Sequence, residues 1–62
     1  MTLSQRIIEY RSNEEVSQAE FANRAGVDRT TIIKAENGGE VSRLTREKIE
    51  RVLKGENDDH QG

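Results

Sequence analysis

The chain has 62 residues, with no cysteine and no proline, and its formal net charge is −2. This length limits it to one domain with a small core, and the lack of cysteine excludes disulfides and thiolate metal sites. No apolar run is long enough to cross a membrane, the N-terminus does not resemble a secretory signal peptide, and an acidic balance is unusual for a protein that binds nucleic acid.

Apolar residues recur three and four positions apart, and alternating strand patterns are absent, so the sequence predicts an all-α fold. The first helix is expected to begin after Thr2, because the Thr2 hydroxyl and the Gln5 side chain can form a reciprocal capping box. We expect this helix to end near residues 12–13. The apolar positions that share one face are Leu3, Ile7 and Tyr10.

The second and third helices are separated by a very short connection. Ser17 and Glu20 match the Ser-x-x-Glu capping box and predict a helix of about eight residues before Gly26. Its inward positions are Phe21, Ala22 and Ala25. Only Val27 and a capping Asp28 precede the third helix, 29–37, which the glycines at 38 and 39 end. Two short helices joined by such a turn must cross at a steep angle.

The fourth helix is expected to have Thr45 as its N-cap, with Leu44 and Ile49 forming a hydrophobic staple. Val52 and Leu53 continue its apolar stripe. The i,i+4 ion pairs expected on its solvent face are Glu47 with Arg51 and Glu50 with Lys54.

The sequence predicts a domain at 1–55 and an acidic flexible tail at 56–62. The tail holds three acidic residues, so the domain has ten basic against nine acidic residues, and basic charge can gather on one of its faces. The single histidine, His60, also lies in the tail. We therefore expect no catalytic imidazole pair, no metal site and no cofactor, and we expect that the protein is not an enzyme. No small-molecule ligand is evident.

Helical geometry separates two faces of the segment 29–37. At about 100° per residue, Ile32 and Ala35 fall on one side and a mostly polar set falls on the other. The outward set is Arg29, Thr30, Ile33, Lys34 and Asn37. These side chains suit the major groove of DNA, where Arg and Lys donate to guanine, Thr contacts several base edges, and Ile packs on a thymine methyl. From these residues alone, an ordinary solvated helix face remains an alternative.

Residues 3–38 contain a combination of motifs that is specific when taken together: the arginine that closes "IIEYR", the "SQAEFA" opening of the second helix, the "AGVDRTTI" turn and the closing "ENG". On these motifs the chain resembles the Cro and phage-repressor helix-turn-helix family, also called the xenobiotic-response-element class. The resemblance implies a small four-helix bundle like lambda repressor. It also implies a transcriptional regulator that binds double-stranded DNA, a repressor of phage, plasmid or mobile-element type, cytoplasmic and nucleoid-associated in a bacterial or phage-infected cell.

The resemblance further implies roles for individual residues. Gln18, which follows the cap of the second helix, is expected to contact a phosphate and to brace the third helix. Base contacts are expected for Arg29 and Thr30, and one turn later for Ile33 and Lys34. Backbone phosphate contacts are expected for Thr31 and Asn37.

Arg11 and Glu36 match a pair that forms a partly buried ion pair in family members, although two independent surface charges are also compatible with the sequence. The segment "GGEVSR" departs from the family, which often has a basic residue and a proline there. Within it, Glu40 lies where a phosphate would approach. Arg43 is expected to reach the DNA backbone or the minor groove, or to remain a solvated loop charge.

A second departure is that the sequence ends before the fifth helix that many members have. The alternatives for assembly are a homodimer through residues such as Val52 and Leu53, a monomer, and a fragment of a longer regulator. The alternative function is a protein-protein interaction module, antitoxin-like or anti-repressor-like, that uses the same fold with residual DNA affinity. The net negative charge and the missing helix favour this alternative.

Overall fold

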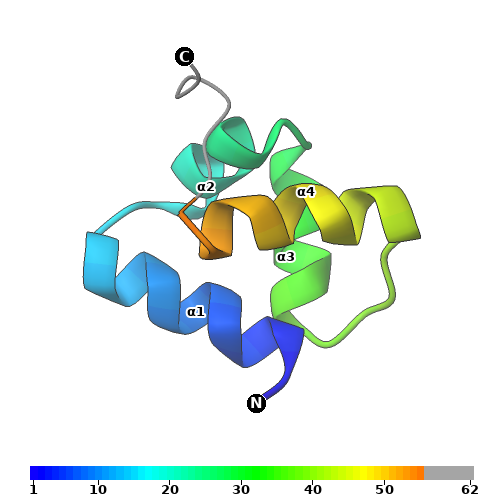
Figure 1. Ribbon diagram of the computed structural model, residues 1–62, viewed down its shortest axis with the longest axis horizontal. Helices are drawn as coiled ribbons and strands as arrows, with labels where there is room; N and C mark the ends of the chain where they lie inside the picture. Colours follow the sequence, from blue (N-terminus) through cyan, green and yellow to red (C-terminus); the bar gives the residue numbers. More distant parts are fainter. Residues whose placement is uncertain (56–62) are drawn as a thin grey trace.

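The computed structural model describes residues 1–55, and within them it has four α-helices and no strand (Figure 1). The helices are α1 (Leu3–Glu14), α2 (Gln18–Ala25), α3 (Arg29–Glu36) and α4 (Arg43–Leu53). The prediction of an all-α fold is confirmed. No helix in the described part is long and apolar enough to cross a membrane. The predicted acidic tail, 56–62, lies outside the described residues.

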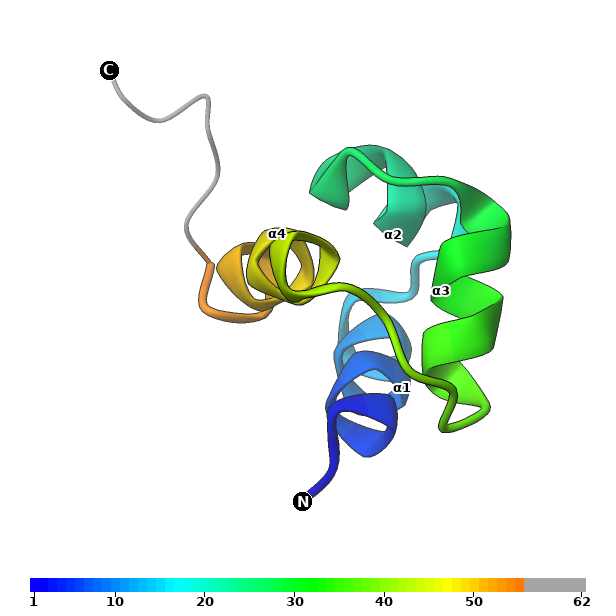
Figure 2. The ribbon, with the colours of Figure 1, turned by 90° about the vertical axis from the view of Figure 1, so that its right-hand side faces the viewer.

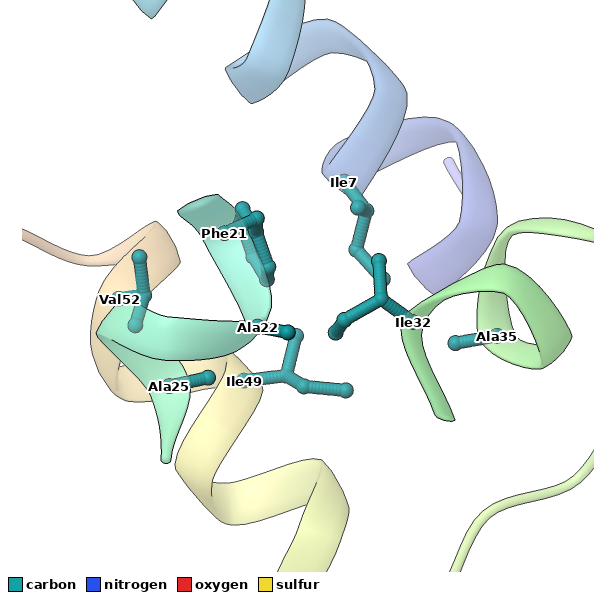
Figure 3. Close-up of a cluster of buried hydrophobic side chains, with 8 residues drawn as sticks. All are labelled: Ile7, Phe21, Ala22, Ala25, Ile32, Ala35, Ile49 and Val52. Atoms are coloured by element: carbon teal, nitrogen blue, oxygen red, sulfur yellow. The ribbon is translucent and has the colours of Figure 1, made fainter. Parts of the chain in front are cut away.

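A single hydrophobic cluster holds the four helices together (Figure 3). Each helix contributes one large side chain with no exposed surface: Ile7, Phe21, Ile32 and Ile49. Three alanines, at positions 22, 25 and 35, and Val52 complete the cluster, and small residues let helix backbones approach closely. Burying each large side chain contributes about 1.5 to 3 kcal/mol, so four of them are a large part of the stability of so short a chain.

The start of α1 agrees with the sequence, and its end does not. Thr2 is the N-cap, its hydroxyl accepts from the Gln5 amide at 3.1 Å, and the Gln5 side chain accepts from the Thr2 amide at 3.1 Å. The helix continues to Glu14, beyond the predicted end at 12–13, and Glu15 then adopts a left-handed conformation with φ 57°. No glycine marks this position, so the sequence carried no signal for the additional residues.

The capping box predicted for α2 is only half formed. Ser17 accepts from the Glu20 amide at 3.0 Å, but the Glu20 carboxylate bonds Arg24 at 3.2 Å. Arg24 also donates to the Tyr10 hydroxyl at 3.0 Å, and the Tyr10 ring packs edge-on against Phe21. The hydrogen bonds to Tyr10 and to Glu20 raise the pKa of Arg24. Glu20 therefore helps to join α2 to α1 rather than closing the box.

The predicted start of α4 is wrong. Ser42 is the N-cap and its hydroxyl accepts from the Thr45 amide at 3.1 Å, so Thr45 lies within the first turn. Leu44 is 61% exposed and forms no staple, while Ile49 is buried as expected. A helix that starts earlier keeps the same inward positions, so the apolar pattern could not distinguish the two caps.

The side chains of α4 also differ from their predicted partners. Glu50 lies 3.6 Å from Arg6 of α1, where a pair with Lys54 was expected, and Glu47 lies 3.8 Å from Arg43. Val52 is 3% exposed. Because Val52 faces the core, the dimer surface proposed for Val52 and Leu53 cannot include it in this conformation.

We expect Ser42→Ala to lower the free energy of unfolding by about 1 kcal/mol, because the Thr45 amide loses its acceptor. Leu44→Ala is the control, since its side chain is mostly exposed, and it is expected to change stability by less than about 0.5 kcal/mol. Urea unfolding followed by circular dichroism measures both values. A larger loss for Leu44→Ala than for Ser42→Ala would contradict this assignment of the helix start.

Candidate nucleic-acid interface

The outer face of α3 is open to solvent. In Figure 2, α3 lies at the right-hand edge of the molecule, with α1 and α4 to its left and α2 above and to its left. Four polar residues of this face are exposed, and they are Arg29, Thr30, Lys34 and Asn37. Ile33 and Thr31 are partly buried, so only part of the outward-facing Ile33 side chain is accessible.

The first turn of α3 has no side-chain cap. Asp28 is the N-cap residue, as predicted, and its carbonyl accepts from the amides of Thr31 at 3.0 Å and Ile32 at 3.3 Å. Its carboxylate makes no cap hydrogen bond, which corrects the expectation that the side chain caps the helix. The helix ends at Glu36, one residue earlier than predicted, and Gly38 adopts φ +87°, a conformation that favours glycine.

The C-terminal end of α3 is fastened to two other helices through one residue, Glu36. One carboxylate oxygen accepts from Arg11 Nη1 of α1 at 2.9 Å, and the other accepts from Gln18 Nε2 of α2 at 2.9 Å. The backbone carbonyl of Glu36 accepts from the Ser4 hydroxyl of α1. We call these four residues, Ser4, Arg11, Gln18 and Glu36, the Glu36 hub.

The Glu36 hub is shielded from solvent. The Glu36 side chain is 9% exposed and that of Arg11 is 25% exposed. Arg11 also donates from Nε to the carbonyl of Val16, so its guanidinium is held at two points. Charge-assisted hydrogen bonds of this kind are strongly directional, and the hub therefore fixes the angle of α3 relative to α1 and α2.

Sequence reasoning brought Arg11 and Glu36 together but missed Ser4. A serine in the first turn of a helix is common whether or not it bonds anything outside that helix. Its partner is a backbone carbonyl 32 positions away, and backbone groups leave no mark in the sequence. Only the packing of the α1 N-terminus against the α3 C-terminus identifies it.

Gln18 and Arg43 are two further candidates from the sequence. The Gln18 amide donates to the Glu36 carboxylate, so Gln18 holds the start of α2 against the end of α3. Arg43 is the first residue of α4 rather than a loop residue, and its side chain is 91% exposed beside Glu47.

The sequence model of a helix-turn-helix family matches residues 7–56, which is most of the chain and all but the first turn of the domain. The chain belongs to this family, of the Cro and phage-repressor type. No curated protein and no solved structure matches it. The family is one of DNA-binding regulatory proteins, and in this helix-turn-helix protein α2 and α3 form the motif.

We expect Arg11→Met to lower the free energy of unfolding by about 2 to 3 kcal/mol, because it leaves the Glu36 carboxylate buried without its cation. The double variant Arg11→Met/Glu36→Gln should lose less, since glutamine carries no charge and can still bond Gln18. Thermal unfolding of both variants against the wild type measures the difference. If the single and double variants lost the same free energy of unfolding, the unpaired charge of Glu36 would not contribute to the loss.

Proposed function

We propose that this protein is a transcriptional regulator that binds specific double-stranded DNA sequences by placing α3 in the major groove. The observation that supports the proposal is the outer face of α3, which presents Arg29, Thr30 and Lys34 from a helix whose angle is fixed by the Glu36 hub. Recognition helices of this motif contact base edges mainly through their N-terminal residues.

The proposed contacts divide into two groups. Arg29 and Thr30, at the start of α3, contact base edges, and the accessible part of Ile33 packs on a thymine methyl. Phosphate contacts, which position the domain without specifying sequence, are proposed for Gln18, Thr31, Asn37 and Arg43. A bidentate arginine on guanine discriminates by about 1 to 3 kcal/mol, so Arg29 carries most of the proposed specificity.

The biological role rests on analogy with the family. We propose a repressor of phage, plasmid or mobile-element type that acts on the nucleoid in the bacterial cytoplasm. Its proposed role is to regulate transcription and not to catalyse a reaction. Family members of this type often bind as two-fold dimers to half-sites about 34 Å apart. A dimer of this chain would need a surface that does not include the buried Val52.

We expect Arg29→Ala to weaken binding to the preferred site by about 5- to 150-fold, which corresponds to the loss of one base contact. Binding to random duplex should fall much less, so the base preference relaxes. Gln18→Ala should weaken both duplexes more evenly, because a phosphate contact is independent of sequence. Selection from a random duplex library supplies the preferred site, and fluorescence anisotropy measures both affinities. Equal losses on both duplexes for Arg29→Ala would remove it from base recognition.

A second candidate function is a protein-interaction module on the same fold. Apolar surface on α1 favours it: Ile8 is 47% exposed, and with Met1 and Gln5 it lines a shallow depression. The net charge of −2 also favours a partner other than DNA. In this case α3 would retain only residual DNA affinity.

A salt titration distinguishes these functions. If the protein binds DNA through several phosphates, log K should fall linearly with log salt, with a slope of about −0.9 for each phosphate neutralised. We therefore expect a steep loss between 50 and 200 mM salt. Binding that is absent at 50 mM salt for both the library and bulk duplex would favour the protein-interaction module.

A further inference from the structure

The side chain of Lys34 lies along the loop that follows α3 rather than over the helix surface before it. A Cβ atom added to Gly39 would lie 2.7 Å from Lys34 Cγ and 3.3 Å from Lys34 Cε. The backbone turns back at this point, because the Gly39 amide donates to the Lys34 carbonyl at 2.9 Å. The Lys34 stem therefore occupies the space that any side chain at position 39 would need.

This direction is opposite to the usual one. Side chains on an α-helix lean toward its N-terminus, which for Lys34 is the half of α3 that carries Arg29 and Thr30. Contact with position 39 turns the stem instead toward the C-terminal end of α3 and the loop 37–42. Figure 2 shows this loop leaving the lower end of α3 and running up and to the left, in front of α1, to α4. The ammonium, one bond beyond Cε, is therefore held near the loop end of α3.

The charged end of Lys34 is available to a ligand. Lys34 is exposed, and it takes part in none of the four ion pairs that join residues of 1–55. The loop beside it contains Glu40 but no basic residue before Arg43. Arg43, at the other end of this loop, lies 3.8 Å from Glu47, so Lys34 is the basic side chain without an ion pair at the α3 end of the loop.

We propose that Lys34 contacts a backbone phosphate rather than a base, and that Gly39 is a positioning residue that directs it there. This assignment replaces the sequence-based expectation of a base contact for Lys34, and it rests on the proposed DNA-binding function. The Lys34 stem can lie in this position only because residue 39 has no side chain. Alanine at this position would displace the Lys34 stem, because the Cγ atom and the Lys34 carbonyl, at 3.1 Å, both lie too close.

Four variants test the proposal: Lys34→Met, Gly39→Ala, their combination, and the control Lys54→Met. Methionine keeps an unbranched stem and removes only the charge. Lys54 is an exposed lysine that follows α4, and in Figure 2 this end of α4 lies on the opposite side of the molecule from α3. Affinities for the preferred site and for random duplex are measured between 50 and 200 mM salt, and thermal unfolding verifies that each variant is folded.

For Lys34→Met we expect the slope of log K against log salt to become shallower by about 0.9, on both duplexes and with unchanged base preference. The wild type would then lose about 3.5-fold more affinity than the variant over this salt range. Lys54→Met should retain the wild-type slope. Gly39→Ala should lose part of the DNA affinity that Lys34→Met loses. Combined with Lys34→Met it should cause no further loss of affinity, because Gly39 acts through Lys34.

Three results would overturn the proposal. A relaxed base preference with an unchanged slope in Lys34→Met would assign Lys34 to a base, and unchanged binding would remove it from the interface. A Gly39→Ala effect that persists in the double variant would mean that Gly39 acts independently. In all three cases the wild type still binds DNA. A wild type that binds neither duplex at 50 mM salt would instead refute the proposed function, and this inference with it.

Discussion

The orientation of α3 depends on the hydrogen bonds that the Glu36 carboxylate accepts. Its two oxygens accept from different helices, Arg11 of α1 and Gln18 of α2, so one residue ties three helices at a single point. The hydrophobic core cannot do this alone, because apolar contact is non-directional and permits small rotations of a short helix. Hydrogen bonds to a nearly buried carboxylate impose both distance and angle, and the outward side chains of α3 take their positions from it.

Ion pairing within the domain explains how a chain with a net negative charge can present a basic face. Four of the ten basic side chains form ion pairs with acidic residues inside the described domain, through Arg6, Arg11, Arg24 and Arg43. These pairs lie between helices or along α2 and α4. The outer face of α3 has basic side chains, Arg29 and Lys34, and no acidic side chain among its exposed residues. Net charge averages over the molecule, whereas a groove meets only one face.

The sequence predicted the elements well where two independent signals coincided. The start of α1 and the end of α2 each combined an apolar pattern with a specific capping residue, and both are confirmed. The prediction failed where two candidates satisfied the same rule. Ser42 and Thr45 are equally good N-caps for α4, and Glu20 can either close its capping box or pair with Arg24. Local rules cannot choose between such alternatives, because distant neighbours decide them.

The sequence by itself therefore determined the all-α class, the tight pair of helices and the division of α3 into an inward and an outward face, since each follows from periodicity and capping within a few residues. The family motifs additionally indicated the Arg11 and Glu36 pair. Only the tertiary structure decided the partners of Gln18, the capping of the Glu36 carbonyl by Ser4, and the direction of the Lys34 stem across Gly39. These depend on backbone groups and empty spaces brought together from distant parts of the chain, and no residue type in the sequence encodes them.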